Sequence, residues 1–435
     1  MPSSELSRRR FLQSSAALAA ALPLAGCQTP TRRRSPNERL HLGVIGVANR
    51  GTANLNGVAS ETIVALCDVD SRHLGQAAAR FPDAAQYHDF RRMLERTDLD
   101  AVVISTPDHT HAVAALAAMD AGLDVYCEKP LAHNLEEVRR MTVMARRKRR
   151  ITQMGIQIHA GENYRRVVEK IQSGLIGRVE ECHVWVGKSW WADHRPEEAQ
   201  AIPDSLHWDL WLGPAPACDY HAAYHPAGWR RYWEFGGGTL ADMGCHHMDL
   251  AHWALDLEHP AEIEAEGPPV HPEGAPQWQI VHYRYPSRGP LGRRLPAVQL
   301  HWYHGGKRPP QFQEEGLLPS WGDGVLFIGS KGMLLSDYGR HVLLPEEKFQ
   351  DVTVPEPYLA SSPGHHQEWI QACKSREKSS CDFSYSGPLS EAALLGNLAY
   401  RMESKIDWNW RHQKAGGLSE AEALISRQAR PGWQF

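Results

Sequence analysis

The first third of the chain alternates between short apolar runs and helix-like segments. Apolar runs of strand length occupy the stretches LHLGVIGV, TIVALCDVD, LDAVVISTP and LDVYCEKP. Helix-like segments lie between them, at residues 71–81, 89–96 and 109–121. Because strands that alternate with helices form a parallel sheet with helices on both faces, this part of the chain predicts a doubly wound α/β domain.

After about residue 160 the pattern changes to longer strands in which polar and apolar positions alternate. The stretches RVEECHVWVG, QWQIVHYRYP, AVQLHWYHGG and GVLFIGSKGMLL have this character, and a long Gly- and Pro-rich segment at 203–238 reads as a loop. Alternation of this kind is typical of an antiparallel sheet with one solvated face. A chain of 435 residues is also too long for one ordinary core. We therefore predict two domains, 39–160 and 161–435, the second built on a large, open, mostly antiparallel sheet.

The N-terminal residues have the pattern of a targeting signal, and we do not expect them to belong to either folded domain. The stretch SRRRFLQ precedes an Ala-rich run that ends in LAGC, which is the pattern of a twin-arginine export signal followed by a lipobox. We expect residues 1–27 to be the signal, 28–38 a tether, and Cys27 the site of a lipid anchor. The protein is then exported, periplasmic or membrane-anchored, with contact to the membrane only through that lipid. No other segment approaches 18 apolar residues.

Composition changes this picture in three ways. The formal charge of −4 gives no reason to expect a nucleic acid partner. Eight of the 15 tryptophans lie between Trp185 and Trp253, where they could line a pocket for a sugar-like ligand or fill a core. The seven cysteines that follow Cys27 are an odd number and form no CxxC pair. Because the twin-arginine route carries proteins that are already folded, we expect mostly free, buried thiols.

The first strand runs directly into a glycine-containing turn, GVIGVANRG. Aligned with G-x-G-x-x-G, the turn reads Gly46-x-Ala48-x-x-Gly51, and such a turn lets a diphosphate approach the backbone at a helix N-terminus. Asp68 ends the second strand 17 residues after Gly51, where a carboxylate can hold a ribose diol. Its charge would repel a 2′-phosphate, which favours NAD, while the nearby Arg72 keeps NADP open. A glycine turn in another doubly wound fold is the alternative.

The stretch TLADMGCHHMDLAHWAL concentrates polar side chains in an otherwise apolar helix. We expect Thr239 to be its N-cap, since a hydroxyl can accept from a free backbone N–H. Asp242, His246, Asp249 and Trp253 recur at i, i+4, i+7 and i+11, so they share one face. From the segment alone this face could bind a metal, transfer protons or lie in a core.

Three separate motifs, in order along the chain, resemble those of the Gfo/Idh/MocA oxidoreductase family. They are the stretches TPDHTH and EKP at the ends of the third and fourth strands and GGGTLADMGCHHMD downstream. The resemblance covers roughly residues 40 to 435. It implies a Rossmann domain followed by an α/β domain with a large open sheet, an NAD(P) cofactor and a sugar or polyol substrate. It also implies a homodimer or homotetramer built through that sheet.

The same resemblance implies the roles of three residues. Lys129 of the E-K-P motif corresponds to the catalytic lysine, and Asp242 and His246 to its partners. Oxidation of a secondary alcohol removes a proton from oxygen while a hydride leaves carbon. We expect His246 to take that proton, with its tautomer fixed by Asp242 or Asp249, and Lys129 to polarise the same oxygen; the reverse assignment stays open.

The remaining predictions concern cofactor and metal. Asp242 and His246 could be two metal ligands, with a third from His221 or His225, but the resemblance assigns this face to substrate and we predict no metal. Ala48 departs from the glycine motif and crowds the diphosphate turn slightly. The residues expected to contact the cofactor are Gly46, Ala48, Asn49, Arg50, Gly51, Asp68, Thr106, Pro107, His109, His111, Glu128 and Lys129.

Export and redox chemistry together constrain the function, because free NAD is scarce outside the cytoplasm. An exported enzyme would have to carry its cofactor bound and restore it within each cycle. We predict an oxidoreductase acting on a sugar, polyol or glycoside with a tightly bound, recycled cofactor. A redox-neutral glycoside hydrolase, lyase or epimerase is the first alternative, and a non-catalytic carbohydrate-binding lipoprotein is the second. The sequence leaves the sugar, the carbon oxidised and the oligomeric state open.

Overall fold

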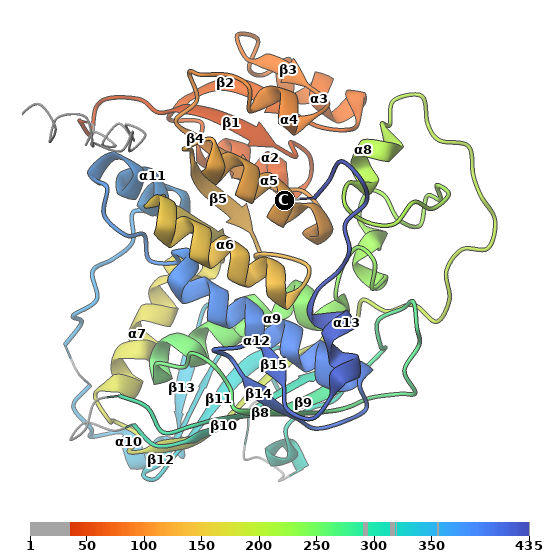
Figure 1. The fold of residues 1–435 in the computed structure, drawn as a ribbon. Coiled ribbons are helices and arrows are strands. Elements are labelled where there is room, and N and C mark those ends of the chain that lie inside the picture. The colour runs from red at the N-terminus through yellow and green to blue at the C-terminus, as the bar shows by residue number, and fades with distance from the viewer. Residues whose placement is uncertain (1–34, 290–294, 314–317, 319, 355, 435) are drawn as a thin grey trace, which may run out of the picture.

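A computed structural model describes residues 35–289, 295–313, 318, 320–354 and 356–434 (Figure 1). The predicted export signal, the lipobox and most of the tether lie outside these residues. The described chain forms two sheets with helices between and around them, and the second sheet is the larger (Figure 1). In the described part of the chain, no helix combines the length and apolar character needed to cross a bilayer.

The first sheet is the predicted parallel, doubly wound one. Its six strands have the order β3-β2-β1-β4-β5-β6 and all neighbours are parallel, which is the Rossmann arrangement. Strand β4 is apolar throughout, and β1 is apolar and buried from Leu42 onward, because helices cover both faces of the sheet. The strands are β1 (His41–Ile45), β2 (Thr62–Cys67), β3 (Ala85–Tyr87), β4 (Ala101–Ile104), β5 (Asp124–Glu128) and β6 (Thr152–Gly155). The helices are α2 (Arg50–Gly57), α3 (Ser71–Ala78), α4 (Phe90–Met93), α5 (Asp108–Asp120) and α6 (Leu135–Lys148).

The second sheet has nine strands in the order β13-β12-β11-β7-β10-β9-β8-β14-β15. Only the β7–β10 pair is parallel, so the prediction of a large, mostly antiparallel sheet is confirmed. The strands are β7 (Val179–Val186), β8 (Glu262–Glu266), β9 (Gln279–Tyr285), β10 (Val298–His304), β11 (Gly324–Gly329), β12 (Gly332–Ser336), β13 (His341–Leu344), β14 (Ile406–Asn409) and β15 (Lys414–Ala415).

Helices α7, α9 and α12 form a layer between the two sheets (Figure 1). Helix α12 packs against α6 of the first domain and against α9 of the second, so it joins the two domains. The remaining helical elements are α7 (Glu162–Gln172), α8 (Trp208–Leu212), α9 (Gly238–Leu255), α10 (Glu346–Phe349), α11 (His365–Ser375), α12 (Phe383–Arg401) and α13 (Glu422–Ile425), with 3-10 turns η1 (Gln157–Ala160), η2 (Gly228–Arg231), η3 (Pro310–Gln313) and η4 (Ser419–Ala421).

Helix α11 crosses the predicted domain boundary. Its residues lie in the sequence of the second domain, but Trp369 and Ile370 are buried in the hydrophobic core of the Rossmann sheet beside Val44 and Leu55. His365, at the start of this helix, is also buried, with only 4% of its surface exposed. The first domain therefore takes part of its core from near the C-terminus.

Two other segments differ from the sequence predictions. GVLFIGSKGMLL is not one long strand but the hairpin β11–β12, since the two residues between Gly329 and Gly332 reverse the chain. The segment 203–238 is not an open loop, because its aromatic side chains make a small core of their own in which Trp208 and Trp211 stack at 4.6 Å. The seven described cysteines are unpaired and six are buried, as predicted.

Candidate active site

A cavity of about 990 Å³ lies between the two domains, at the carboxyl ends of the Rossmann strands. This is where ligands bind in open α/β sheets. The cavity extends from the glycine turn to the α9 helix and brings together most of the predicted site. The predicted residues that line it are Gly46, Ala48, Asn49, Arg50, Asp68, Thr106, Pro107, Glu128, Lys129, Asp242 and His246.

The turn between β1 and α2 is too tight for side chains at two of its glycines. Gly46 has φ +80°, and a Cβ atom there would lie 2.7 Å from the backbone oxygen of Ser105. A Cβ atom on Gly51 would lie 2.1 Å from the backbone oxygen of Gly46, so Gly51 serves the packing of α2 against β1 and does not line the cavity. The backbone and the N-terminus of α2 are thus exposed to the cavity as a dinucleotide diphosphate requires.

Asp68 lies at the end of β2 beside this turn. Its Oδ2 accepts from the backbone N–H of Val47 at 3.0 Å, and its Oδ1 accepts from that of Asp70 at 2.9 Å. Burial raises the pKa of Asp68, while these two backbone donors oppose the rise. The carboxylate is thereby held in one orientation at the cavity wall, as a partner for ribose hydroxyls must be. Together with the glycine turn, Asp68 fits a dinucleotide cofactor.

At the other end of the cavity, the carboxylate of Asp242 accepts from three side chains. Lys129 Nζ lies 2.9 Å from Oδ1, Arg230 Nε lies 2.9 Å from the same oxygen, and Trp190 Nε1 lies 2.9 Å from Oδ2. Lys129 also donates to the backbone oxygen of Asp242. Burial opposes ionisation of Asp242, but Lys129 and Arg230 outweigh it and hold its pKa well below the usual range. Asp242 is therefore an anion that fixes the Lys129 ammonium in place.

Two further groups beside this pair can carry protons. Burial, and then the Lys129 ammonium, lower the pKa of His246 well below its usual value, so its ring is neutral at neutral pH. Burial raises the pKa of Asp108 to about 7, although Lys129 and Arg230 oppose the rise. Asp108 also lines the cavity. The site thus holds a fixed ammonium, a neutral imidazole and a carboxyl group that titrates near neutrality.

The sequence predicted that Asp242 or Asp249 contacts the His246 ring. The structure brings neither carboxylate to it. The Asp242 carboxylate accepts from Lys129, Arg230 and Trp190. Asp249 instead accepts from His159 Nδ1 at 3.0 Å and from the Tyr385 hydroxyl at 2.6 Å. Asp242 and His246 line the cavity, whereas Asp249 is fully buried, because α9 runs from the cavity into the layer of helices that packs against α12. The backbone oxygen of His246 accepts from the Tyr164 hydroxyl, but the His246 ring has no hydrogen-bond partner among the described residues and is available to a ligand.

Three other predicted positions differ from expectation. His109 does not line the cavity, because its Nε2 lies 2.9 Å from the backbone oxygen of Trp211 in the interior. His111 is also buried, with its ring nitrogens 2.8 Å from the carbonyl oxygens of Pro130 and Thr106. It joins the T-P-D-H-T-H and E-K-P loops to each other and so positions the loop that carries Lys129. Thr239 is not the N-cap of α9, since Gly237 precedes the helix and the Thr239 hydroxyl accepts from the N–H of Trp190.

Sequence reasoning did not single out Asp108, Trp190 or Arg230. Asp108 stands in the T-P-D-H-T-H motif, and its position at the first turn of α5 could have indicated it. Arg230 and Trp190 come from segments without regular strand or helix patterns, and only the tertiary structure brings them to Asp242. Residues 203–238, called the aromatic segment from here on, therefore supply Arg230 to the site.

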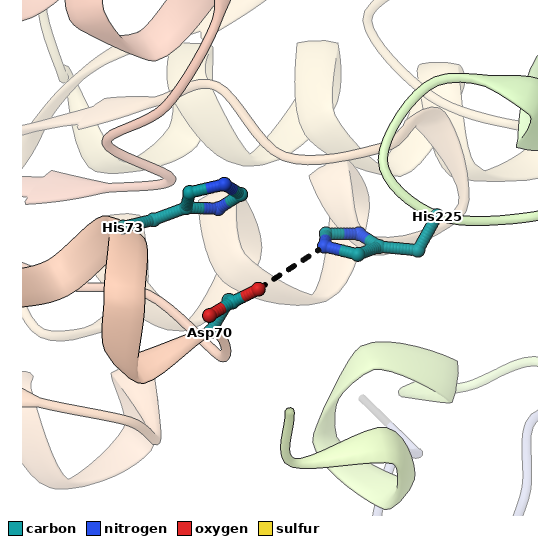
Figure 2. A group of neighbouring side chains, drawn as sticks. All are labelled: Asp70, His73 and His225. Atoms are coloured by element: carbon teal, nitrogen blue, oxygen red, sulfur yellow. Dashed lines mark ion pairs between the residues drawn. The ribbon is translucent and has the colours of Figure 1, made fainter. Parts of the chain in front are cut away.

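The aromatic segment also closes over the Rossmann end of the cavity. The backbone N–H of Ser71 donates to the Ser205 oxygen at 2.8 Å, and that of His207 donates to the Val69 oxygen at 2.9 Å. Figure 2 shows His225, on this segment, facing Asp70 and His73 of the Rossmann domain, with His225 Nε2 3.6 Å from Asp70 Oδ2. These contacts tie the second domain to the cofactor-binding edge of the first.

The trio in Figure 2 has metal-ligand chemistry, with one ligand atom each from Asp70, His73 and His225 within 4.8 Å of one another. However, Asp70 Oδ2 also accepts from the Arg72 guanidinium at 2.7 Å. That guanidinium already balances the carboxylate, and a cation at this position would have to displace it. We assign the trio to the domain contact. The prediction of no metal at Asp242 and His246 stays a prediction.

A dinucleotide turn, a ribose carboxylate and an ion-paired lysine in one interdomain cavity define the class of NAD-binding α/β oxidoreductases. Models of one family match both domains: "Oxidoreductase family, NAD-binding Rossmann fold" over residues 40–156 and "Oxidoreductase family, C-terminal alpha/beta domain" over residues 162–289. The chain belongs to this family, Gfo/Idh/MocA, and its first domain is an NAD-binding Rossmann domain.

Individual proteins of this family are similar to the chain over only part of its length. A glycosyl hydrolase family 109 protein of Saccharopolyspora erythraea is 30% identical over 41% of this chain and 45% of its own length. The myo-inositol 2-dehydrogenase of Thermotoga maritima is 28% identical over 52% of this chain and 58% of its own length. The chain thus spans about half the length of the curated relatives it matches.

Solved structures support the fold over most of the chain. The WlbA dehydrogenase of Chromobacterium violaceum, solved with NADH and UDP-GlcNAcA, superposes with a TM-score of 0.61 at 18% identity and covers 87% of this chain and 98% of its own. Levoglucosan dehydrogenase, solved with NADH and L-sorbose, gives a TM-score of 0.56 at 18% identity over 85% and 99% of the two chains. At such identities these likenesses concern the fold alone.

Proposed function

We propose that this protein is an NAD-dependent oxidoreductase that oxidises a secondary hydroxyl of a sugar, polyol or glycoside. The observation that carries the proposal is the grouping of Lys129, neutral His246 and anionic Asp242 in the cavity that also contains the dinucleotide turn. Relatives named inositol 2-dehydrogenase support the polyol class of substrate. NADP is disfavoured by the negative charge of Asp68 beside the ribose position.

Each polar group then has a role in proton movement. The Lys129 ammonium, held by Asp242, donates a hydrogen bond to the substrate oxygen and stabilises the charge that develops there. The neutral His246 accepts the hydroxyl proton, and Asp108, which titrates near neutrality, can pass protons between this end of the cavity and solvent. The nicotinamide of bound NAD supplies the hydride acceptor. The reverse assignment, with Lys129 as the base, remains the alternative.

We further propose that the protein is exported by the twin-arginine pathway and held as a lipoprotein through Cys27, with NAD bound before export. The aromatic segment supports retention of the cofactor, since it crosses the cavity edge and bonds to the loop that follows Asp68. A retained cofactor must be restored within each cycle, through a second sugar or a redox-neutral reaction. A homodimer or homotetramer built through the nine-stranded sheet completes the proposal.

Redox-neutral cleavage of a glycoside is the second candidate. It is favoured by the relatives named glycosyl hydrolase family 109 proteins, among them the 30% identical one. In this scheme bound NAD would take a hydride from a hydroxyl-bearing carbon, the proton on the carbon next to the new carbonyl would be removed, and the aglycone would leave from the following carbon with a proton. Water would then add in its place and the hydride would return to the carbonyl. The same Lys129, His246 and NAD would serve both candidates.

One panel of sugars and glycosides, assayed for two outputs, tests these proposals. Protein purified without added cofactor is first denatured and its supernatant analysed for NAD; cofactor-free protein would overturn the proposal of retention. NADH that accumulates with added NAD and a free sugar identifies a dehydrogenase. Aglycone release without net NADH identifies the redox-neutral enzyme. Neither output with any substrate would leave the non-catalytic carbohydrate-binding protein as the better description.

A further inference from the structure

Three histidines form a row across the outer face of the nine-stranded sheet, away from the active site. In the strand register, His301 of β10 lies directly opposite His183 of β7 on one side and His282 of β9 on the other. The rings of His183 and His301 stack at 4.9 Å. Glu181 lies two residues before His183 on β7, so its side chain is on the same face.

The side chains in this row place three ligand atoms together. Glu181, His183 and His301 each offer one such atom, and all lie within 4.8 Å of one another. Glu181 Oε1 is 2.8 Å from His183 Nε2. A tetrahedral zinc ion with bonds of about 2.0–2.2 Å needs ligand atoms about 3.3 Å apart, which small rotations of these side chains provide.

The surroundings of His183 suit a metal ligand. Its Nδ1 lies 3.0 Å from the Tyr303 hydroxyl oxygen, which can accept the Nδ1 proton and leave the Nε2 lone pair directed at Glu181. Metal-bound histidines commonly anchor their second nitrogen to an oxygen in this way. The Gln311 amide nitrogen lies 3.2 Å from the same Nε2, and its amide oxygen, buried and without a partner in the described structure, would reach a fourth ligand position after a flip of the amide.

A metal ion can also reach this group of side chains. In the single chain the Glu181 side chain is 43% exposed, so an ion can reach the group before subunits assemble through this sheet, while His183 is almost fully buried.

We propose that Glu181, His183 and His301 bind a borderline divalent transition-metal ion of the Zn²⁺ class, at a site separate from the NAD cavity. Two imidazoles and one carboxylate are donors that Zn²⁺, Co²⁺ and Ni²⁺ accept and that Mg²⁺ does not favour. The site does not depend on the proposed oxidoreductase activity. Its alternative is a purely structural arrangement in which His183 Nε2–H donates to Glu181.

The test uses the untagged full chain, stripped with a chelator and titrated with Zn²⁺ by calorimetry and with Co²⁺ by absorbance. We expect one equivalent of Zn²⁺, a tetrahedral Co²⁺ spectrum, and no comparable response to Mg²⁺. Glu181→Gln and His301→Ala should each weaken binding by at least about tenfold. His194→Ala changes an exposed histidine elsewhere and should bind like the parent.

Circular dichroism and thermal melts show whether each variant is folded; Glu181→Gln keeps the size of an exposed side chain and is expected to fold. Absence of saturable Zn²⁺ binding by the parent protein would overturn the proposal. So would one equivalent bound with unchanged affinity by both Glu181→Gln and His301→Ala, because the ion would then be elsewhere.

Discussion

The ion pair between Lys129 and Asp242 joins the two domains at the floor of the cavity. Lys129 follows a Rossmann strand and Asp242 lies in the first turns of α9, and their charged atoms are 2.9 Å apart. Both side chains are nine-tenths buried, so the pair is weakly screened by solvent. The orientation of the ammonium that meets substrate therefore depends on how the second domain is seated on the first.

Removal of the Lys129 ammonium should abolish catalysis and leave the fold intact. In Lys129→Ala the Asp242 carboxylate keeps Arg230 and Trp190 as donors, so the buried charge is not left unpaired. We expect kcat to fall by about 10²–10³-fold, the usual loss when one donor to the developing charge is removed. Steady-state kinetics on the substrate found in the panel measure this, with Lys331→Ala, at an exposed turn, as the control. Equal rates in the two variants would refute the site.

Asp108 should impose a pH dependence near neutrality. Because its pKa in the folded protein is raised to about 7, the folded state binds a proton there between the ordinary carboxyl range and neutrality that the unfolded chain does not. The free energy of unfolding should accordingly decrease as pH rises towards 7. In Asp108→Asn this slope should flatten, and the inflection near pH 7 in kcat/KM should disappear. Urea unfolding and kinetics across pH measure both; a profile unchanged by the substitution would exclude Asp108 from the proton path.

His225 should control how long NAD stays bound. Loss of its contact with Asp70 in His225→Ala frees one tie between the aromatic segment and the Rossmann domain. Because the two atoms are 3.6 Å apart and form no hydrogen bond, the contact contributes at most about 1 kcal/mol, which corresponds to an up to roughly fivefold faster cofactor dissociation. Stopped-flow release of NAD, trapped by excess competitor, measures the rate, and His194→Ala is the exposed control. An unchanged dissociation rate would mean that the segment does not retain the cofactor.

Asp68 should set the choice between NAD and NADP. Its fixed carboxylate at the cavity wall repels a second negative charge, and like charges brought together cost several kcal/mol. In Asp68→Asn the preference for NAD over NADP should shrink by at least about tenfold, mainly through tighter NADP binding. Calorimetric titration with each dinucleotide checks this. If both dinucleotides lost affinity equally, the carboxylate would have a structural role only.

The sequence predicted the parts of this molecule that depend on local pattern. The glycine turn, Asp68 and Lys129 all sit at strand ends, and the order of a doubly wound sheet brings strand ends to one edge. The helical period of α9 was also predicted, but of the residues expected to share one functional face only Asp242 and His246 line the cavity. The residues that pack against a helix face are set by the tertiary structure. The hydrogen bonds that His159 and Tyr385 make to Asp249 therefore could not be predicted from the helical pattern.

The same limit explains the residues that were missed. Arg230 comes from a Gly- and Pro-rich segment whose aromatic residues have no strand or helix period. That segment is ordered by side-chain packing, as in the stack of Trp208 on Trp211, and not by backbone pattern. Asp108 differs, because its type and position were visible, but its raised pKa depends on burial that appears only in the folded chain.

The position of α11 has a consequence for synthesis. Trp369 is fully buried in the Rossmann core, so the dinucleotide domain lacks part of its interior until this helix has left the ribosome. Co-translational folding of the N-terminal domain alone would leave Val44 and Leu55 without that cover. The Rossmann core that supports the dinucleotide turn is therefore completed only when nearly the whole chain has been synthesised.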